Sequence, residues 1–357
     1  MVAAAPSRVG AAPAGRLVPP GLLLAGLGAL LVVALLLGAG IGAVHVSAPD
    51  VVTIVLRHLG LDVGEVDPQQ DAIVWVIRLP RVLLGALVGG GLAVAGAALQ
   101  GLFRNPLADP GLIGVSSGAS VGAVGVIALG LTGAFVGATQ AAAFLGGVLA
   151  AAVVYALARN DGRTETVTLV LTGIAVSAIC GAAIGFLIAR ADDDRLRDAV
   201  FWSLGSLGGA TWRTVALTAP AVAIGAAVAI GRARTLDLMT LGEREAGHLG
   251  VDTERVRIVL VAATALATGA AVAAAGIVAF VGLVAPHLVR LAAGPAHRVL
   301  LPASFLAGAA LLTLADLVAR TAAAPTELPL GVVTSLAGGP FFLWLIWRTR
   351  NAHGGWG

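Results

Sequence analysis

Lysine is absent from this sequence of 357 residues, and all 22 basic residues are arginine. A Walker A phosphate-binding loop requires a lysine that reaches the nucleotide phosphates, so the chain is not itself an ATPase of that class. Charged residues are also scarce, at 11% against about 25% in a typical soluble domain. Because 58% of the residues are hydrophobic, a water-soluble fold could not cover them. The composition therefore indicates a polytopic membrane protein.

Other scarce features narrow the function further. The one cysteine, Cys180, lies in an apolar segment, so an intrachain disulfide is excluded and we interpret the thiol as an inert packing group. No pair of the six histidines has metal-ligand spacing, so we predict no metal site. The net charge of +3 is small, and we explain it by membrane topology rather than by a nucleic-acid partner.

Long apolar runs predict an all-α protein with about ten membrane crossings. Val82–Phe103 contains 22 residues without a charge, enough for a helix to cross a hydrocarbon core of about 30 Å at about 1.5 Å per residue. The first run, Gly21–Val44, is longer than a usual signal-peptide core, so we interpret it as a retained crossing. The other crossings are expected at 112–131, 135–158, 166–190, 213–231, 256–276, 278–293, 299–319 and 330–347.

The segments around these crossings predict the domain limits. Residues 1–19 are expected to be a disordered cytoplasmic lead, 20–350 a single ten-helix domain, and 351–357 a tail. Residues 45–77 are expected to form a short amphipathic helix that ends at His58, followed by an acidic loop. That loop contains Asp62, Glu65, Asp67 and Asp71.

The distribution of arginine predicts the orientation. With the N-terminus in the cytoplasm, 14 arginines fall on the inner side of the membrane and eight on the outer side. This asymmetry agrees with the positive-inside rule. Ten crossings then return the C-terminus to the cytoplasm as well.

Three ordered motifs carry a resemblance to a known family. They are RLPR with RNPLADP within Arg78–Ala119, LGEREAGHLGVDTERVR at Leu241–Arg257, and GIVAFVGLVAPHLVR at Gly276–Arg290, which continues into Ala315–Ile346. Together they resemble the permease subunits of type II ATP-binding-cassette importers for iron-siderophores, haem and cobalamin. The match runs from about residue 70 to the end of the chain.

The resemblance implies how such a subunit works. It implies a homodimer in the bacterial inner membrane, two cytoplasmic ATPase subunits that bind ATP and magnesium, and a periplasmic substrate-binding protein. The permease itself would hold no cofactor. An ion-driven carrier or an intramembrane enzyme is the remote alternative, and it would need buried acidic or nucleophilic groups. Asp316 is the nearest candidate for such a group.

The resemblance also implies two partner surfaces. Residues 236–252 match the coupling helix that seats in the ATPase, and we expect three small or apolar residues there to share one helical face. An ordinary solvated loop is the alternative. Arg78, Arg81 and Arg320 match residues that meet acids of the binding protein, with interfacial snorkelling and an Asp316–Arg320 pair as alternatives. The expected coupling residues are Leu241, Gly242, Glu243, Arg244, Ala246, Leu249 and Gly250.

A polar turn follows the helix at Val82–Phe103. Its residues Asn105, Pro106, Asp109 and Pro110 are expected to form a stiff inner turn through Asx-type hydrogen bonds and fixed φ angles. We expect this turn to hold the gate-side ends of two helices beside the coupling helix.

The stretch Ala189–Trp212 is expected to carry substrate specificity. Its segment LRDAVFWSLGSLGGATW resembles haem permeases more than siderophore or cobalamin permeases, although a self-neutralised surface loop is the alternative. A dimer would present each arginine twice, which suits the two propionates of haem. We predict Arg197 as the main contact, with Arg190 beside it and with Phe201 and Trp202 against the macrocycle.

Overall fold

The computed structural model describes residues 18–61, 63–160 and 163–352. Most of the predicted N-terminal lead and of the C-terminal tail lies outside these residues. The described chain is almost entirely helical. Its elements are α1 (Pro20–Gly40), α2 (Ala48–His58), α3 (Pro68–Ala72), the π-helix η1 (Ile73–Arg78), α4 (Leu79–Phe103), the 3-10 helix η2 (Pro110–Ile113), α5 (Val115–Ala128), α6 (Ala138–Ala158), β1 (Arg159–Asn160), β2 (Arg163–Thr164), α7 (Thr166–Ile188), α8 (Asp193–Leu204), α9 (Trp212–Gly231), α10 (Ala233–Met239), α11 (Glu243–His248), α12 (Thr253–Ala275), α13 (Val281–Ala293), α14 (His297–Thr321) and α15 (Leu330–Ala352).

Ten of these elements correspond to the predicted crossings. In the described residues, seven helical stretches are long and apolar enough to span a membrane, and three shorter apolar helices occur in α5, α13 and α15. The first crossing is α1, as predicted. The shortening of α5 has a local cause, because the chain first makes η2 and then starts α5 after Gly114, whose φ is +78°.

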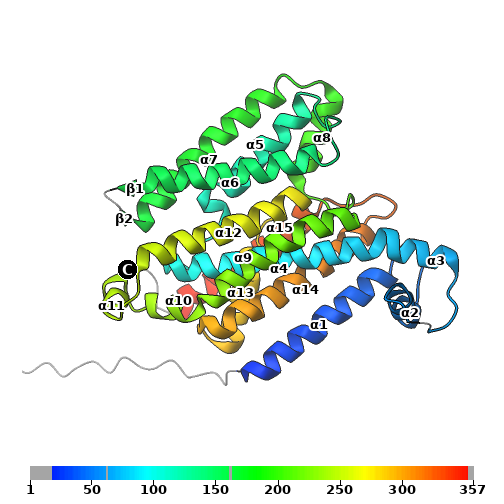
Figure 1. Ribbon diagram of the computed structural model, residues 1–357, viewed down its shortest axis with the longest axis horizontal. Coiled ribbons are helices and arrows are strands. Elements are labelled where there is room, and N and C mark those ends of the chain that lie inside the picture. The colour runs from blue at the N-terminus through cyan, green and yellow to red at the C-terminus, as the bar shows by residue number, and fades with distance from the viewer. Residues whose placement is uncertain (1–17, 62, 161–162, 353–357) are drawn as a thin grey trace, which may run out of the picture.

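The helices form two layers, and α4 is buried inside the larger one. Figure 1 shows α5, α6 and α7 on one side of the molecule, α12, α9, α13 and α14 around α4, and α1 on the opposite side. α12 joins the layers, because it packs against α4 and α9 and also against α5 and α6. α1 begins and α15 ends at the end of the molecule that carries α10 and α11 (Figure 1), which agrees with the predicted location of both termini on one side.

Glycine allows the central helices to come into backbone contact. A Cβ atom on Gly96 of α4 would lie 1.9 Å from the carbonyl oxygen of Gly282 in α13. A Cβ atom on Gly89 would lie 2.2 Å from the carbonyl oxygen of Gly308 in α14. Small residues of this kind are typical of membrane helix interfaces, where close approach replaces the hydrophobic drive of water.

The outer end differs in part from the prediction. The short helix before residue 59 is confirmed as α2, and Ser47 caps it by accepting a hydrogen bond from the Asp50 amide at 3.3 Å. The predicted acidic loop is confirmed only as far as Asp67, because Asp71 lies in α3, and Asp62 lies outside the described residues. Asp67 caps α3 by accepting a hydrogen bond from the Gln69 amide at 3.0 Å, and the helix then continues through η1 into α4. The helix continues past Pro80, which lies two residues after the π-helical turn η1, where the regular α-helical hydrogen-bond ladder is already displaced.

Candidate functional site

The predicted coupling segment folds as two short helices at one end of the molecule. α10 buries Leu236 and Met239 in the core, and the chain then turns at Gly242, whose φ is +129°, into α11. The expected shared apolar face was wrong. Ala246 is fully buried against the permease, whereas Leu241 and Leu249 are exposed at 63% and 60%. α11 has only six residues, so both leucines lie outside the helix and flank it.

Five exposed residues of this segment form a surface that we call the coupling surface: Leu241, Arg244, Glu245, His248 and Leu249. It combines two projecting apolar side chains with charges of both signs. The chain then turns away at Gly250, whose φ is +83°. Such a surface can dock into a groove of a partner, while Ala246 holds it to the membrane domain.

A buried arginine behind the coupling surface ties α11 to the bundle. Arg257 of α12 donates from Nη2 to Glu243 at 2.6 Å and from Nη1 to Glu254 at 2.8 Å. Glu254 also accepts hydrogen bonds from the Tyr155 hydroxyl of α6 and from the Thr164 hydroxyl of β2, the latter at 2.8 Å. The prediction missed this network. Its one signal in the sequence is the helical i, i+3 spacing of Glu254 and Arg257.

A second contact fixes α10. Asp237 Oδ1 accepts a hydrogen bond from the His297 amide at 2.8 Å and lies 2.7 Å from Nδ1 of the same residue. His297 begins α14, and its ring lies against Gly101 near the end of α4. α10 is therefore held against the start of α14 and close to the end of α4, which the polar turn follows.

The predicted Asx-type bonds of the polar turn are confirmed. Asn105 Oδ1 accepts a hydrogen bond from the Leu107 amide at 2.9 Å, and Asp109 Oδ1 accepts one from the Gly111 amide at 2.8 Å. Pro110 is buried at the start of η2, whereas Pro106 is exposed. The gating role of this turn stays a prediction.

At the opposite end, two of the predicted docking arginines cap α1. Arg78 is buried, and its Nη1 lies 3.0 Å and 2.9 Å from the carbonyl oxygens of Ala39 and Gly40. Arg320 donates to the carbonyl oxygen of Ile41 at 2.9 Å. Since the last carbonyl groups of a helix lack partners within it, these contacts satisfy the end of α1.

The third predicted docking arginine is held by two acids. Arg81 donates to Asp316 at 2.9–3.1 Å and to Glu327 at 2.8 and 2.9 Å. The alternative Asp316–Arg320 pair is longer, at 3.7 Å. The Arg81 hydrogen bonds hold the pKa of Glu327 below its ordinary value of 4.5. Docking of a binding protein at these arginines stays a prediction, and it would require them to exchange the partners they have within the chain.

The specificity stretch forms α8, which packs on α5. Arg197 is 69% exposed and lies 3.9 Å from Asp194, and Phe201 is exposed one turn later. Trp202 instead packs against the core residues around Ala199, so it supports the helix from inside. Arg190 is exposed, and its guanidinium carbon lies 5.2 Å from the centroid of the Phe186 ring. The structure thus places Arg197 and Phe201 side by side on the free face of α8.

Among the described residues, no group of three or more histidine, cysteine or acidic side chains could hold a metal ion. A cavity lies elsewhere, between α6, α9 and α12, and none of the four predicted pathway residues lines it. Arg213 does line it, a residue to which the sequence analysis assigned no site role.

The comparisons with known proteins agree on one family. The FecCD transport family matches residues 30–348. The chain is 48% identical over 283 residues to the cobalamin import system permease protein BtuC of Halobacterium salinarum, covering 79% of this chain and 75% of the relative. It is 46% identical over 292 residues to the hemin transport system permease protein HmuU of Yersinia pestis, covering 79% of this chain and 85% of the relative.

The solved structures give the same result. A structure described as an inward-facing conformation of a metal-chelate type ABC transporter superposes with a TM-score of 0.81 at 31% identity. The match covers 92% of this chain and 99% of that chain. The overall fold is therefore shared with a known ABC transporter structure.

Proposed function

The chain belongs to the FecCD transport family, and on this premise we propose that it is the permease through which haem is imported. The family makes it a multi-pass inner-membrane subunit of an ABC importer for haem, cobalamin or an iron-siderophore, and a transport component without catalytic activity of its own. The ATP that drives import would be hydrolysed by partner ATPase subunits. A substrate-binding protein would deliver the ligand from outside.

One observation carries the choice of haem. Arg197 and Phe201 lie one turn apart on the free face of α8, and neither is needed to hold the helix in place. An arginine suits a propionate through a charge-assisted hydrogen bond, and an aromatic ring suits a flat macrocycle. In the proposed homodimer this pair occurs twice, which matches the two propionates of haem.

Cobalamin is the second candidate, because the BtuC relative of Halobacterium salinarum is as similar to this chain as the hemin permease is. The ion-driven alternative has less support. It needs a buried acid that can exchange protons or ions, and Asp316 is held by Arg81 in a bidentate contact.

The proposed power stroke enters through the coupling surface. Closure of the ATPase dimer would move α11, and Arg257 would pass that movement to α12. Asp237 would pass movement of α10 to α14 through His297. Both contacts end on helices that pack against α4, so the inner ends of the central helices would move together.

The test is uptake into proteoliposomes that contain the permease, its ATPase and its binding protein. We expect ATP-dependent uptake of haem in preference to cobalamin. Arg197→Ala should lower haem uptake at limiting substrate by about tenfold or more, since a hydrogen bond to a charged group contributes about 1.5–3 kcal/mol. Assembly with the ATPase should be unchanged.

Arg57→Ala is the matched control, because Arg57 is an exposed arginine at the end of α2, away from α8. It should leave haem uptake unchanged. Preference for cobalamin, or equal haem uptake by the Arg197→Ala variant and the native chain, would contradict the haem assignment.

A further inference from the structure

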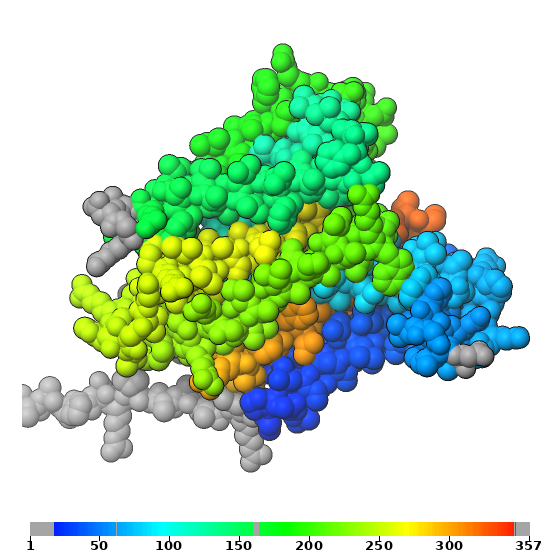
Figure 2. Space-filling model, in the orientation of Figure 1, coloured from blue at the N-terminus to red at the C-terminus, as the bar shows by residue number. Residues whose placement is uncertain are grey.

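A groove of about 540 Å³ lies near the outer ends of α6 and α9. α12 packs against both helices and forms the floor between them. In Figure 2 the yellow surface of α12 is visible between the green α6 and the lime α9. This groove is separate from the free face of α8 and from the coupling surface.

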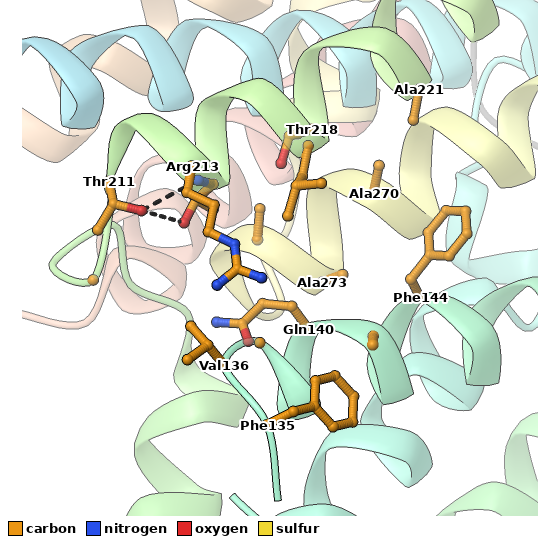
Figure 3. A pocket seen from close by; sticks show the side chains of 16 residues that line it. Phe135, Val136, Gln140, Phe144, Thr211, Arg213, Thr218, Ala221, Ala270 and Ala273 are labelled. Atoms are coloured by element: carbon orange, nitrogen blue, oxygen red, sulfur yellow. Dashed lines mark hydrogen bonds between the residues drawn. The ribbon is translucent and has the colours of Figure 1, made fainter. Parts of the chain in front are cut away.

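The outer rim of the groove is polar and positively charged. Figure 3 shows the guanidinium group of Arg213 reaching over the cavity toward Gln140 of α6. Thr211 lies beside them, and its hydroxyl is 2.9 Å from that of Thr214. Among the residues that the structure describes, no ion pair or side-chain hydrogen bond of Arg213 is found. Of the described residues that line the cavity, none is acidic.

The deeper part of the groove is apolar. It is lined by Phe144, Ala221 and Ala270. Arg213 and Ala221 are eight residues apart on α9, so the groove follows that helix for about 12 Å at 1.5 Å per residue. A cation at the membrane surface above an apolar slot is a pattern typical of a site for a lipid with a phosphate head and an acyl tail.

The mouth of the groove opens toward hydrocarbon. Phe135, Val136 and Leu217 line it and are strongly exposed. Ile224, two turns beyond Leu217 on α9, continues this exposed apolar face. Exposed side chains of this kind are stable only against a lipid tail or a protein partner.

We propose that the groove binds one anionic phospholipid of the outer leaflet. Its phosphodiester accepts hydrogen bonds from Arg213, and one acyl chain lies along α12 against Phe144 and Ala270. Because the lining has a cation but no acid, it offers no partner for the ammonium group of a zwitterionic lipid. Phosphatidylglycerol therefore fits better than phosphatidylcholine.

The bound lipid would pack between the two helix layers. The groove lies where α6, in the layer of α5 and α7, meets α9 of the central group. A bound chain fills the gap and holds the layers at a fixed spacing. The inference does not depend on haem as the transported ligand, so the two proposals can fail separately.

The test counts lipids retained by the purified full chain in native mass spectrometry. The chain is first equilibrated in detergent with either phosphatidylglycerol or phosphatidylcholine. The native chain should retain one phosphatidylglycerol with at least tenfold preference, and this lipid should raise its melting temperature. Arg213→Gln should abolish the preference, and Arg57→Gln, at another exposed outer arginine, should retain it.

Ala221→Phe provides a second variant, because the larger side chain fills the slot without touching the cation. It should prevent retention of either lipid, and an unchanged melting temperature without lipid would show that it folds. Equal retention of the two lipids by the native chain would overturn the proposal, as would unchanged preference after Arg213→Gln. Displacement of the lipid by haem, or loss of dimers after Ala221→Phe, would assign the groove to the substrate or to a second copy instead.

Discussion

Replacing Arg257 with methionine removes the cation that joins α11 to α12. The side chain is 3% exposed, whereas those of its partners Glu254 and Glu243 are 21% and 41% exposed. Glu254 would keep only Tyr155 and Thr164 as hydrogen-bond donors. Because removal of one partner leaves a largely buried carboxylate uncompensated, we expect a loss of about 3 kcal/mol in unfolding free energy.

The two acids should contribute unequally. Glu243 is partly solvated, so its pair with Arg257 should contribute about 1 kcal/mol or less. Glu254 is more buried and belongs to a network, so a double-mutant cycle of Arg257→Met with Glu254→Gln should give a coupling energy of about 2 kcal/mol. Loss of Glu243 should therefore loosen α11 more than it destabilises the bundle.

Two assays separate these effects. Reversible unfolding in mixed micelles measures the stability of each variant, and binding of the ATPase to the permease in nanodiscs measures the coupling surface. Glu243→Gln should weaken ATPase binding by up to about fivefold, which corresponds to about 1 kcal/mol. Arg255→Met is the control, because Arg255 is an exposed neighbour on the same helix. Equal stability of Arg257→Met and Arg255→Met would refute the reasoning.

Two further predictions concern packing and pH. Gly96→Ala should lower the melting temperature, because the added Cβ would lie 1.9 Å from the Gly282 carbonyl oxygen. Gly181→Ala is the control and should not lower it, because no atom lies within 4 Å of its added Cβ. Equal melting temperatures of the two variants would contradict the backbone contact. Glu327→Gln should destabilise the chain at neutral pH, because the Arg81 hydrogen bonds lower the pKa of Glu327 from 4.5. A lowered pKa gives stability above the ordinary value that is lost as the pH falls through the folded pKa, so native chain and variant should converge below pH 4.5. A difference that persists under acid would exclude this ion pair as the cause.

The crossings could be predicted because long uncharged runs have few alternatives to a membrane helix. Val82–Phe103 reads directly as such a run. Its extension back to Pro68 could not be predicted, because Arg78 and Pro80 interrupt the apolar pattern. In the structure the buried charge of Arg78 is satisfied, because its guanidinium donates to the carbonyl oxygens at the end of α1.

The partners of Arg81 and Arg320 could not be predicted from the sequence, for a different reason. Arg81 meets Asp316, which lies 235 residues away in the sequence. The spacing within one helix suggested Arg320 as the partner of Asp316 instead. Local periodicity reports neighbours on one helix, whereas these contacts depend on how α4 and α14 pack. The motif match carries no information on the burial of these arginines, which the packing of the helices determines.

In the coupling segment, one feature could be predicted from the sequence and another could not. Its location and short helix followed from the motif, and α11 is present. The orientation of its apolar residues did not follow, because a helix of six residues has no continuous face for Leu241 and Leu249 to share. That exposure makes the two leucines available to a partner.

The most direct test of the account is ATP-driven uptake by the reconstituted importer, compared between the native permease and a Leu241→Asp, Leu249→Asp double variant. Both leucines are exposed, so the double variant should fold with an unchanged melting temperature. The account predicts that it fails to bind the ATPase and loses haem uptake, while the native permease imports haem only when ATP is hydrolysed. Haem uptake by the native permease without ATP, or full uptake by the double variant, would contradict it.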